Sequence, residues 1–158
     1  MDFTKNNNIV KLIGLTERCL VMYRQLEFKE YNLGSCHHSY LFFINRNNGV
    51  YQDVVSKNLH INKSNVTRNI QYLEKEGYIY REVCKDDKRK YRLYLTQKAR
   101  DILPLIRNKI RQMNEELVVG LSDDELTLFI SLLSKICVNA CNFIDNKYMV
   151  GDIDENNN

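Results

Sequence analysis

The stretch NKSNVTRNIQYLEKEG, from Asn62 to Gly77, decides the fold of this 158-residue chain. When the stretch is projected at about 100° per residue, Val66, Ile70 and Leu73 fall within one narrow arc and polar side chains lie opposite. Asn is a favoured helix N-cap, and Gly is favoured just past a helix C-terminus. The stretch therefore predicts a helix with one buried face and one polar face.

The polar face of this helix differs from the Glu/Lys mixture of an ordinary surface helix. Ser, Asn, Gln and Arg side chains can hydrogen-bond base edges and phosphates from the major groove of DNA. The candidate DNA-binding residues of the helix are Asn62, Lys63, Ser64, Asn65, Thr67, Arg68 and Gln71. A solvated polar face without a ligand is the alternative interpretation.

A charged hairpin should follow the helix. Residues 78–84 and 91–95 are rich in aromatic and aliphatic side chains, and the six residues between them are all charged. On a protruding ribbon, Arg89 can reach the neighbouring minor groove, with Asp87 holding it extended through a charge-assisted bond. The candidate DNA-binding residues of the hairpin are Asp87, Lys88, Arg89 and Lys90. A loop that only adds solubility is the alternative.

The spacing of apolar residues predicts helices on both sides of this segment. The predicted helices, including the first one described, cover residues 9–31, 36–46, 51–58, 62–76, 96–119 and 122–146. Ser35 and Thr96 are expected to cap two of them, and Ser122 with Glu125 forms a capping box for the last. Pro104 removes a backbone donor inside its helix and predicts a kink there.

A short helix, a tight connection, a second helix and a hairpin make a winged helix-turn-helix. The expected fold is therefore mostly α with a small β-hairpin wing. The terminal helices carry more apolar surface than the winged domain can cover, which indicates oligomerisation. The predicted parts are an N-terminal dimerisation helix (1–34), the winged helix-turn-helix (35–95), C-terminal dimerisation helices (96–147) and a disordered tail (148–158).

The charge of the chain is concentrated in its middle. The net charge is +3, but residues 57–98 hold eleven basic and five acidic side chains, so this segment is +6 and the remainder is −3. That asymmetry is typical of a domain that binds a polyanion, although a solvated charged face gives the same count.

Other classes of protein find little support in the sequence. It contains no G-x-S-x-G, phosphate-binding glycine loop, H-E-x-x-H or Cys-x-x-Cys motif, which argues against an enzyme. The longest purely apolar run, Tyr40–Ile44, is far shorter than the ~20 residues of a membrane span, and the N-terminus does not resemble a secretory signal. Five cysteines in an unexported chain favour reduced thiols. We therefore expect a soluble, cytoplasmic protein that does not contact membranes.

Several of these motifs resemble the MarR family of transcriptional regulators. The similar segments are Leu59–Arg68, Leu73–Ile79 with Arg81, Asp87-Lys88-Arg89, and Leu95-Thr96. Two departures are Val54-Val55, where the family commonly has Leu-Ala, and Ala99, where it often has Gly. The resemblance implies a homodimer whose terminal helices interleave and whose winged domains bind an inverted-repeat operator in double-stranded DNA. It also implies a repressor that is released by a small ligand, often phenolic, or by a stress signal.

Two features raise the question of a sensor. Cys36-His37-His38, with Glu27, Glu30 or Glu115, has the chemistry of a zinc site. Adjacent helical residues point about 100° apart, however, so we interpret these side chains as structural and predict no metal or cofactor.

Cys19 is a candidate redox sensor, because its place in the first helix resembles that of a reactive cysteine in peroxide-sensing members of the family, where Tyr40 would lie nearby. A buried, inert cysteine is the alternative. Two alternative functions therefore remain, a cysteine-based redox regulator and a winged helix that binds protein without contacting DNA.

Overall fold

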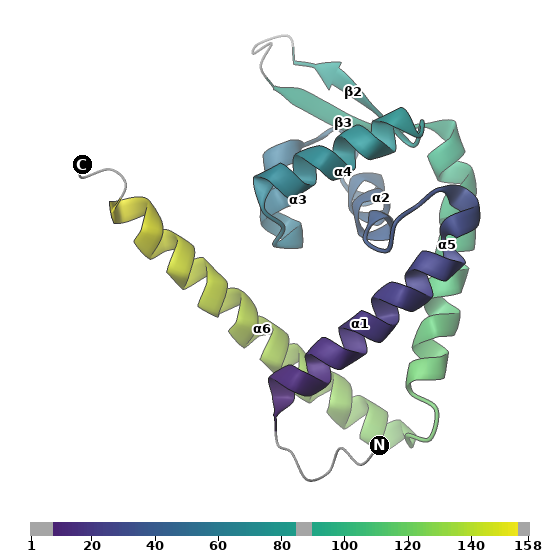
Figure 1. Cartoon of the computed structure of the whole chain (residues 1–158), viewed down its shortest axis with the longest axis vertical. Coiled ribbons are helices and arrows are strands. Elements are labelled where there is room, and N and C mark those ends of the chain that lie inside the picture. The colour runs from purple at the N-terminus through teal and green to yellow at the C-terminus, as the bar shows by residue number, and fades with distance from the viewer. Residues whose placement is uncertain (1–7, 85–89, 155–158) are drawn as a thin grey trace. The chain divides into compact units, whose positions relative to one another are not determined.

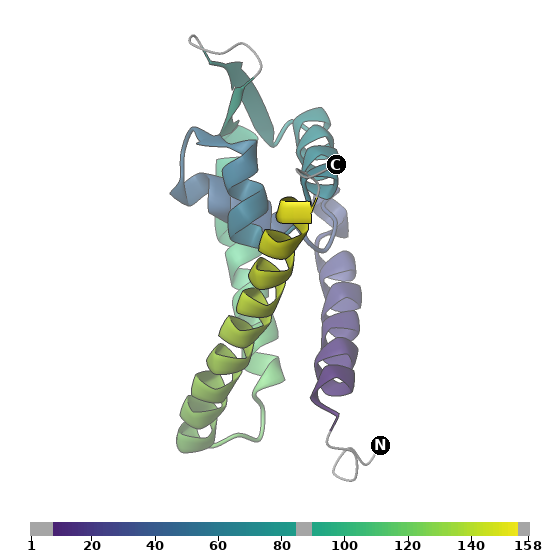
Figure 2. The same ribbon diagram turned by 90° about the vertical axis from the view of Figure 1, so that its left-hand side faces the viewer.

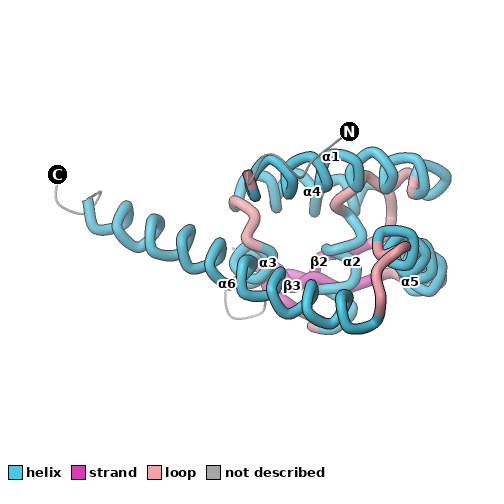
Figure 3. Tube along the Cα trace, turned by 90° about the horizontal axis from the view of Figure 1, so that it is seen from below, coloured by secondary structure: helices cyan, strands magenta, loops and turns pink. Residues whose placement is uncertain are grey.

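The computed structural model describes residues 8–84 and 90–154 and is mostly helical, with a small three-stranded antiparallel sheet (Figures 1 and 3). This architecture confirms the predicted fold class. The chain divides into two compact units, residues 1–110 and residues 111–158, which we describe separately.

Most elements belong to the first unit. They are α1 (Ile9–Glu27), η1 (Lys29–Tyr31), α2 (His37–Arg46), β1 (Val50–Tyr51), α3 (Gln52–Leu59), α4 (Lys63–Lys75), β2 (Ile79–Val83), β3 (Tyr91–Leu95) and α5 (Gln97–Leu117), the last of which continues past the boundary. Helix α5 is continuous through Pro104.

The predicted ends of α4 are confirmed. The Asn65 backbone N–H donates to Asn62 Oδ1 over 2.8 Å, and Gly77 has a positive φ of 73° just past the helix. The Thr96 cap of α5 is also present, since the Ala99 N–H donates to Thr96 Oγ1 over 3.2 Å. Local sequence therefore sets these helix ends, as expected for residues whose side chains satisfy free backbone groups.

The connection between α1 and α2 differs from the prediction. Helix α1 ends at Glu27, and the buried Phe28 leads into the 3₁₀ turn η1. The predicted Ser35 cap is wrong, because the N-cap position of α2 is Cys36 and no side chain caps it. The His37 N–H instead donates to the Gly34 carbonyl over 3.1 Å, so the chain is already turning before the helix begins.

The sheet has the strand order β1-β3-β2, and its β2–β3 hairpin extends beyond helices α2–α4 (Figures 1 and 2). Ile79 pairs with Leu95 and Val83 with Tyr91, in the register of a hairpin. Strand β1 was not predicted, because two residues are too short to show alternation. Gly49 precedes it with φ of 78°, and a Cβ at this position would lie 3.0 Å from the Tyr94 hydroxyl, so a larger residue would strain the backbone and displace the Tyr94 side chain.

The core of the first unit lies between the winged elements and α5. Val66, Ile70 and Leu73 are each 0% exposed, which confirms the predicted buried arc of α4. They belong to one cluster that also includes residues of α2, β3 and α5. Burial of these side chains at roughly 1.5–3 kcal/mol each holds α4 with its polar face outward.

The second unit consists of the end of α5 and helix α6 (Asp123–Asp154). The predicted capping box is confirmed, because the Ser122 N–H donates to Glu125 Oε2 over 2.8 Å and the Glu125 N–H donates to Ser122 Oγ over 3.3 Å. The same backbone hydrogen bond lowers the pKa of Glu125. Helix α6 continues to Asp154, into the stretch expected to be a disordered tail, and residues 155–158 lie outside the described residues.

Helix α6 presents apolar side chains that its own unit does not cover. Exposed examples are Leu128, Phe129, Ile130, Leu132, Val138 and Ile144. An 18-residue window within Asp123–Asn146 has a mean hydropathy of 1.6, so this part of the helix is, by length and composition alone, sufficient to cross a membrane. The length of uninterrupted apolar runs in the sequence did not reveal this segment, because scattered polar residues shorten each run without making the helix polar. An exposed apolar surface of this kind is typical of an interaction site.

Candidate nucleic-acid interface

Helix α4 presents an exposed polar face opposite its buried arc. Ser64, Arg68 and Gln71 are all exposed and lie within about 60° of one another around the helix. Arg68 donates to the Asn65 side-chain oxygen one turn earlier, which holds the guanidinium along the helix surface. These side chains offer the donors and acceptors that base edges in a major groove require.

The predicted residues at the start of α4 have a local structural task. Asn62 Oδ1 accepts from the Ser64 hydroxyl over 3.0 Å as well as from the Asn65 N–H, so the Asn62 side chain acts as the helix cap. Lys63 is exposed beside it. Because the residues beside this cap are exposed, a polyanion can approach the first turn of α4. The partial positive charge of the helix N-terminus favours its binding there.

Thr67 lies on a flank of α4 rather than on its exposed polar face, which we call the open face. Its hydroxyl donates to the Lys63 carbonyl over 2.9 Å and accepts from the Gln52 side-chain amide over 2.7 Å. The Gln52–Thr67 hydrogen bond links the two helices of the helix-turn-helix. Contact between Thr67 and DNA stays a prediction. In the structure, the Thr67 side chain helps to set the position of α4 against α3.

The wing is tied to the same flank of α4. Arg81 of β2 donates through Nε to Glu74 Oε1 over 3.0 Å, and the guanidinium carbon lies 5.3 Å from the centre of the Tyr91 ring. The hydrogen bond to Glu74 raises the pKa of Arg81. Sequence reasoning missed this link, although the acid–base spacing of seven residues between the end of a helix and the next strand was the available signal.

The predicted wing-tip residues Asp87, Lys88 and Arg89 lie outside the described residues. Lys90 is described and exposed at the start of β3, where its carbonyl accepts from the Cys84 N–H over 3.0 Å. A shallow pocket of about 300 Å³ lies between the wing root, α3 and α4. The pocket is lined by Tyr51, Gln52, Asp53, Thr67, Arg81, Lys90 and Tyr91. The root of the wing and α4 therefore line one shallow pocket together.

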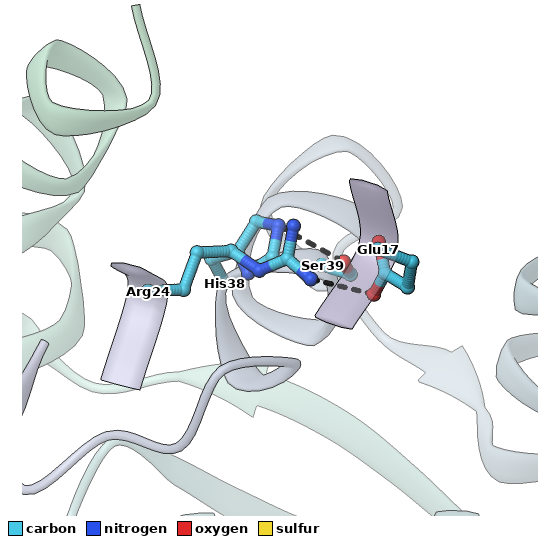
Figure 4. Close-up of polar contacts among 4 residues, drawn as sticks. All are labelled: Glu17, Arg24, His38 and Ser39. Carbon is cyan, nitrogen blue, oxygen red and sulfur yellow. Dashed lines mark hydrogen bonds and ion pairs between the residues drawn. The ribbon is translucent and has the colours of Figure 1, made fainter. Parts of the chain in front are cut away.

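A second polar cluster lies between α1 and α2 (Figure 4). The Arg24 side chain is only 11% exposed and donates to Glu17 Oε1 over 2.7 Å. His38 Nε2 lies 3.3 Å from Ser39 Oγ. Within the described chain, neither Arg24 Nε nor His38 Nδ1 has a hydrogen-bond partner although both atoms are buried. Buried polar atoms normally find a partner, so this cluster is incomplete.

The surroundings of His38 are apolar. The ring centres of Phe28 and Phe42 lie 5.7 and 6.1 Å from the centre of its imidazole. Burial lowers the pKa of His38 to about 4, and the positive charge of Arg24 adds to this effect. At neutral pH the His38 side chain is therefore uncharged beside a fixed cation.

The predicted sensor residues differ in their exposure to solvent. Cys19 is exposed on α1, and the Tyr40 side chain is 0% exposed with its hydroxyl unpaired in the described chain. Among the residues that the structure places, no group of three His, Cys, Asp or Glu side chains can hold a metal ion. His37 and His38 have separate contacts, which agrees with interpreting them as structural side chains.

The fold and its open polar helix define a class, the winged helix-turn-helix transcriptional regulators that bind DNA. Residues 32–90 match the model of the MarR family. The chain is 30% identical over 128 residues to the HTH-type transcriptional regulator BilQ of Clostridioides difficile strain CD3, covering 79% of this chain and 86% of BilQ. It is 26% identical over 130 residues to YybA of Bacillus subtilis strain 168, an uncharacterized HTH-type transcriptional regulator, covering 82% and 87% of the two chains.

A solved structure gives the same result. A MarR family transcriptional regulator from Listeria monocytogenes, complexed with a 26mer DNA, is 29% identical with a TM-score of 0.79, over 87% of this chain and 91% of that one. The chain belongs to the MarR family of DNA-binding transcriptional regulators. This membership confirms the resemblance found in the sequence and the prediction that the protein is not an enzyme.

Proposed function

We propose that this protein is a cytoplasmic homodimeric repressor that binds an inverted-repeat operator and is released by a small aromatic acid. The observation that carries the proposal is the open face of α4, where Ser64, Arg68 and Gln71 are exposed above a fully buried arc. Arg68 would read a base edge in the major groove. The wing tip, residues 87–90, would contact the adjacent minor groove and phosphates. The Listeria relative complexed with DNA supports this mode of binding.

The proposed dimer interface consists of the terminal helices. On α1 the exposed apolar side chains include Val10 at 81%, Met22 at 65% and Leu26 at 74%. On α6 the window 123–146 is 0% buried in the single chain. Apolar surface of this extent is typical of an obligate interface. Two-fold symmetry would then place two copies of α4 about one helical turn of DNA apart.

The proposed effector site is the cluster of Arg24 and His38 between α1 and α2. Among the residues that the structure describes, the buried Arg24 Nε–H has no acceptor, and a carboxylate would supply one beside the existing ion pair with Glu17. Phe28 and Phe42 beside His38 would contact an aromatic ring. A benzoate-like or phenolic acid fits this combination of one cation and two aromatic side chains.

One experiment tests the DNA-binding proposal. Duplexes of random sequence, 26 base pairs long like the DNA bound by the Listeria regulator, are selected on the full-length protein and sequenced. We expect an inverted repeat whose affinity falls steeply with salt, because phosphate contacts release counterions. We call the winning sequence the selected duplex. Binding with no sequence preference and no dependence on salt would favour the alternative of a protein-interaction module.

Two further measurements test the finer claims. Sedimentation should give a dimer at all working concentrations, and a stable folded monomer would refute the proposed assembly. Benzoate and salicylate should weaken binding to the selected duplex and restore transcription from a template that carries it. Arg24→Met should abolish that response while the protein still binds DNA, since it removes the cation and keeps the length of the side chain.

A further inference from the structure

A buried histidine connects α2 to the flank of the recognition helix. Of the side chains that the structure describes, that of His37 is the only polar one buried in the core, with 6% exposed. It lies at the first position of α2, and its Nε2 is 3.0 Å from Oδ1 of Asn69 on α4. A buried polar group costs free energy unless it is hydrogen-bonded, so loss of this contact would destabilise the fold.

The hydrogen bonds around His37 fix the role of each atom. The Gly34 N–H donates to His37 Nδ1 over 2.8 Å, so Nδ1 carries a lone pair and the proton of the neutral ring is on Nε2. Nε2–H therefore donates to Asn69 Oδ1. The Asn69 amide nitrogen in turn donates to the Asn65 carbonyl over 2.8 Å, which sets the orientation of the amide. Asn69 Oδ1 also accepts from the Cys36 thiol over 3.5 Å, so a second residue at the start of α2 contacts the same amide.

Further contacts join the same loop to the same flank. The His37 ring stacks on the Tyr72 ring with 4.8 Å between their centres. The Tyr72 hydroxyl donates to the Asn32 carbonyl over 2.8 Å. The segment from Asn32 to His37 therefore holds two α4 residues, Asn69 and Tyr72, that lie about 60° apart around the helix.

Helix α4 is consequently held on both flanks of its open face. Thr67 and Glu74, on one flank, bond to α3 and to the wing. Asn69 and Tyr72, on the other flank, bond to the connection between α1 and α2. The second set also leads to the open face, because Asn65 accepts from Asn69 through its carbonyl and from Arg68 through its side chain. These contacts oppose rotation of α4 about its axis, in addition to the packing of its buried arc.

We propose that His37 and Asn69 are positioning residues for DNA recognition, which fix the rotation of α4 so that Arg68 meets its base. A binding side chain must be held within about 10–20° of its productive orientation, which packing and the hydrogen bonds of supporting residues achieve together. The inference rests on the proposed function, in which α4 reads the operator. It assigns to the α1–α2 connection a direct role in sequence preference.

The test compares affinities for the selected duplex and for a scrambled duplex of the same length and composition, at one salt concentration. His37→Phe keeps the ring and its stacking on Tyr72 but removes both hydrogen bonds. We expect the selected duplex to bind more weakly, so that the ratio of the two affinities falls about tenfold. A loss of this size is typical when one contact to a base is lost. Affinity for the scrambled duplex should change less than twofold, because phosphate contacts tolerate a rotated helix.

Rescue and control variants separate positioning from packing. In His37→Gln the side-chain amide retains a donor near the place of Nε2, so the ratio should return to within about threefold of the unmodified protein. Tyr78→Phe removes a hydrogen bond of 2.6 Å from the Tyr78 hydroxyl to the Tyr31 carbonyl, close to the same connection but outside α4. This control should leave the ratio unchanged although it lowers stability by about 1 kcal/mol.

Asn69→Ala gives an independent measurement if His37→Phe does not fold. It should lower the ratio as much as His37→Phe does, and the double variant should lower it no further, because both changes remove one link. The inference is overturned if Asn69→Ala leaves the ratio unchanged, or if Tyr78→Phe lowers it equally. Arg68→Ala identifies which claim has failed. If Arg68→Ala also leaves the ratio unchanged, the proposed function of α4 fails, and if it lowers the ratio, only the inference about His37 and Asn69 fails.

Discussion

Helices α4 and α6 differ in how far the rest of the chain covers their apolar side chains. Helix α4 has 13 residues, and its three apolar arc residues are each 0% exposed within the first unit. Helix α6 has 32 residues, and its apolar window is 0% buried within the chain. One helix is completed by its own domain and leaves polar groups for a ligand. The other exposes its apolar side chains, which a second chain would cover in the proposed dimer.

The largest effect should follow from a charge on α6. Phe129→Asp would bury an unpaired carboxylate in the proposed interface, which costs about 3 kcal/mol or more and weakens the dimer at least a hundredfold. Sedimentation and thermal unfolding measure this, and both dimer mass and stability should fall. Asn142→Asp adds the same charge at an exposed polar position of α6 and should have little effect. A full-mass, fully stable Phe129→Asp dimer would place the interface elsewhere.

On α4, a change in the open face should alter binding and spare the fold. Arg68→Ala should cost about 1–3 kcal/mol on the selected duplex and relax the preference at one base position in each half-site. Its unfolding temperature should move little, because Arg68 is exposed. Arg100→Ala removes an exposed arginine from α5 and serves as the matched control. Equal losses in both variants would indicate a general charge effect rather than base reading.

Acid should distinguish the two units. Burial lowers the pKa of His38 to about 4 and also lowers that of His37, whereas residues 111–158 contain no histidine. The unfolded chain binds protons at a pKa near 6.5 and the folded one does not, so stability is complete above this value and is lost as the pH falls towards 4. His38 alone should lower the free energy of unfolding by about 1 kcal/mol between pH 7.5 and 5.5.

Denaturant unfolding across this pH range measures the effect. The variant His38→Leu should reduce the pH dependence, because its side chain binds no proton in either state. Lys135→Leu, on α6, is the control and should leave the slope unchanged. A slope that His38→Leu does not alter would mean that the pKa of His38 is the same in the folded and the unfolded protein.

The smallest effects concern the caps that begin the two helices. Asn62→Ala and Ser122→Ala should each cost about 0.5–1 kcal/mol of stability, because each leaves a backbone N–H without its side-chain acceptor. Asn62→Ser keeps an acceptor and should retain stability. Only the Asn62 variants should also weaken DNA binding. If Ser122→Ala weakens it equally, the two helices are less independent than we propose.

Most of the fold could be predicted because local rules determine it. The arc of Val66, Ile70 and Leu73 and the caps at Asn62 and Ser122 depend on residues within a turn or two of one another. The two-residue strand β1 is too short to show the alternation of apolar and polar residues by which strands are predicted. Helix α2 begins from a turn before His37 and not from the expected Ser35 cap. The links Arg81–Glu74 and His37–Asn69 join residues that only the tertiary fold brings together. Sequence could therefore name the open face of α4 but not the contacts that orient it.

The hydropathy of α6 also bears on how cells make this protein. A newly synthesised chain that has not met a second copy displays a helix with the length and composition of a membrane segment. Chaperones, proteases and insertion machinery act on exposed apolar segments of this kind, so unpaired chains should be short-lived. Cellular abundance would then depend on the square of the synthesis rate at low expression, and the amount of active regulator would fall sharply when its own synthesis slows.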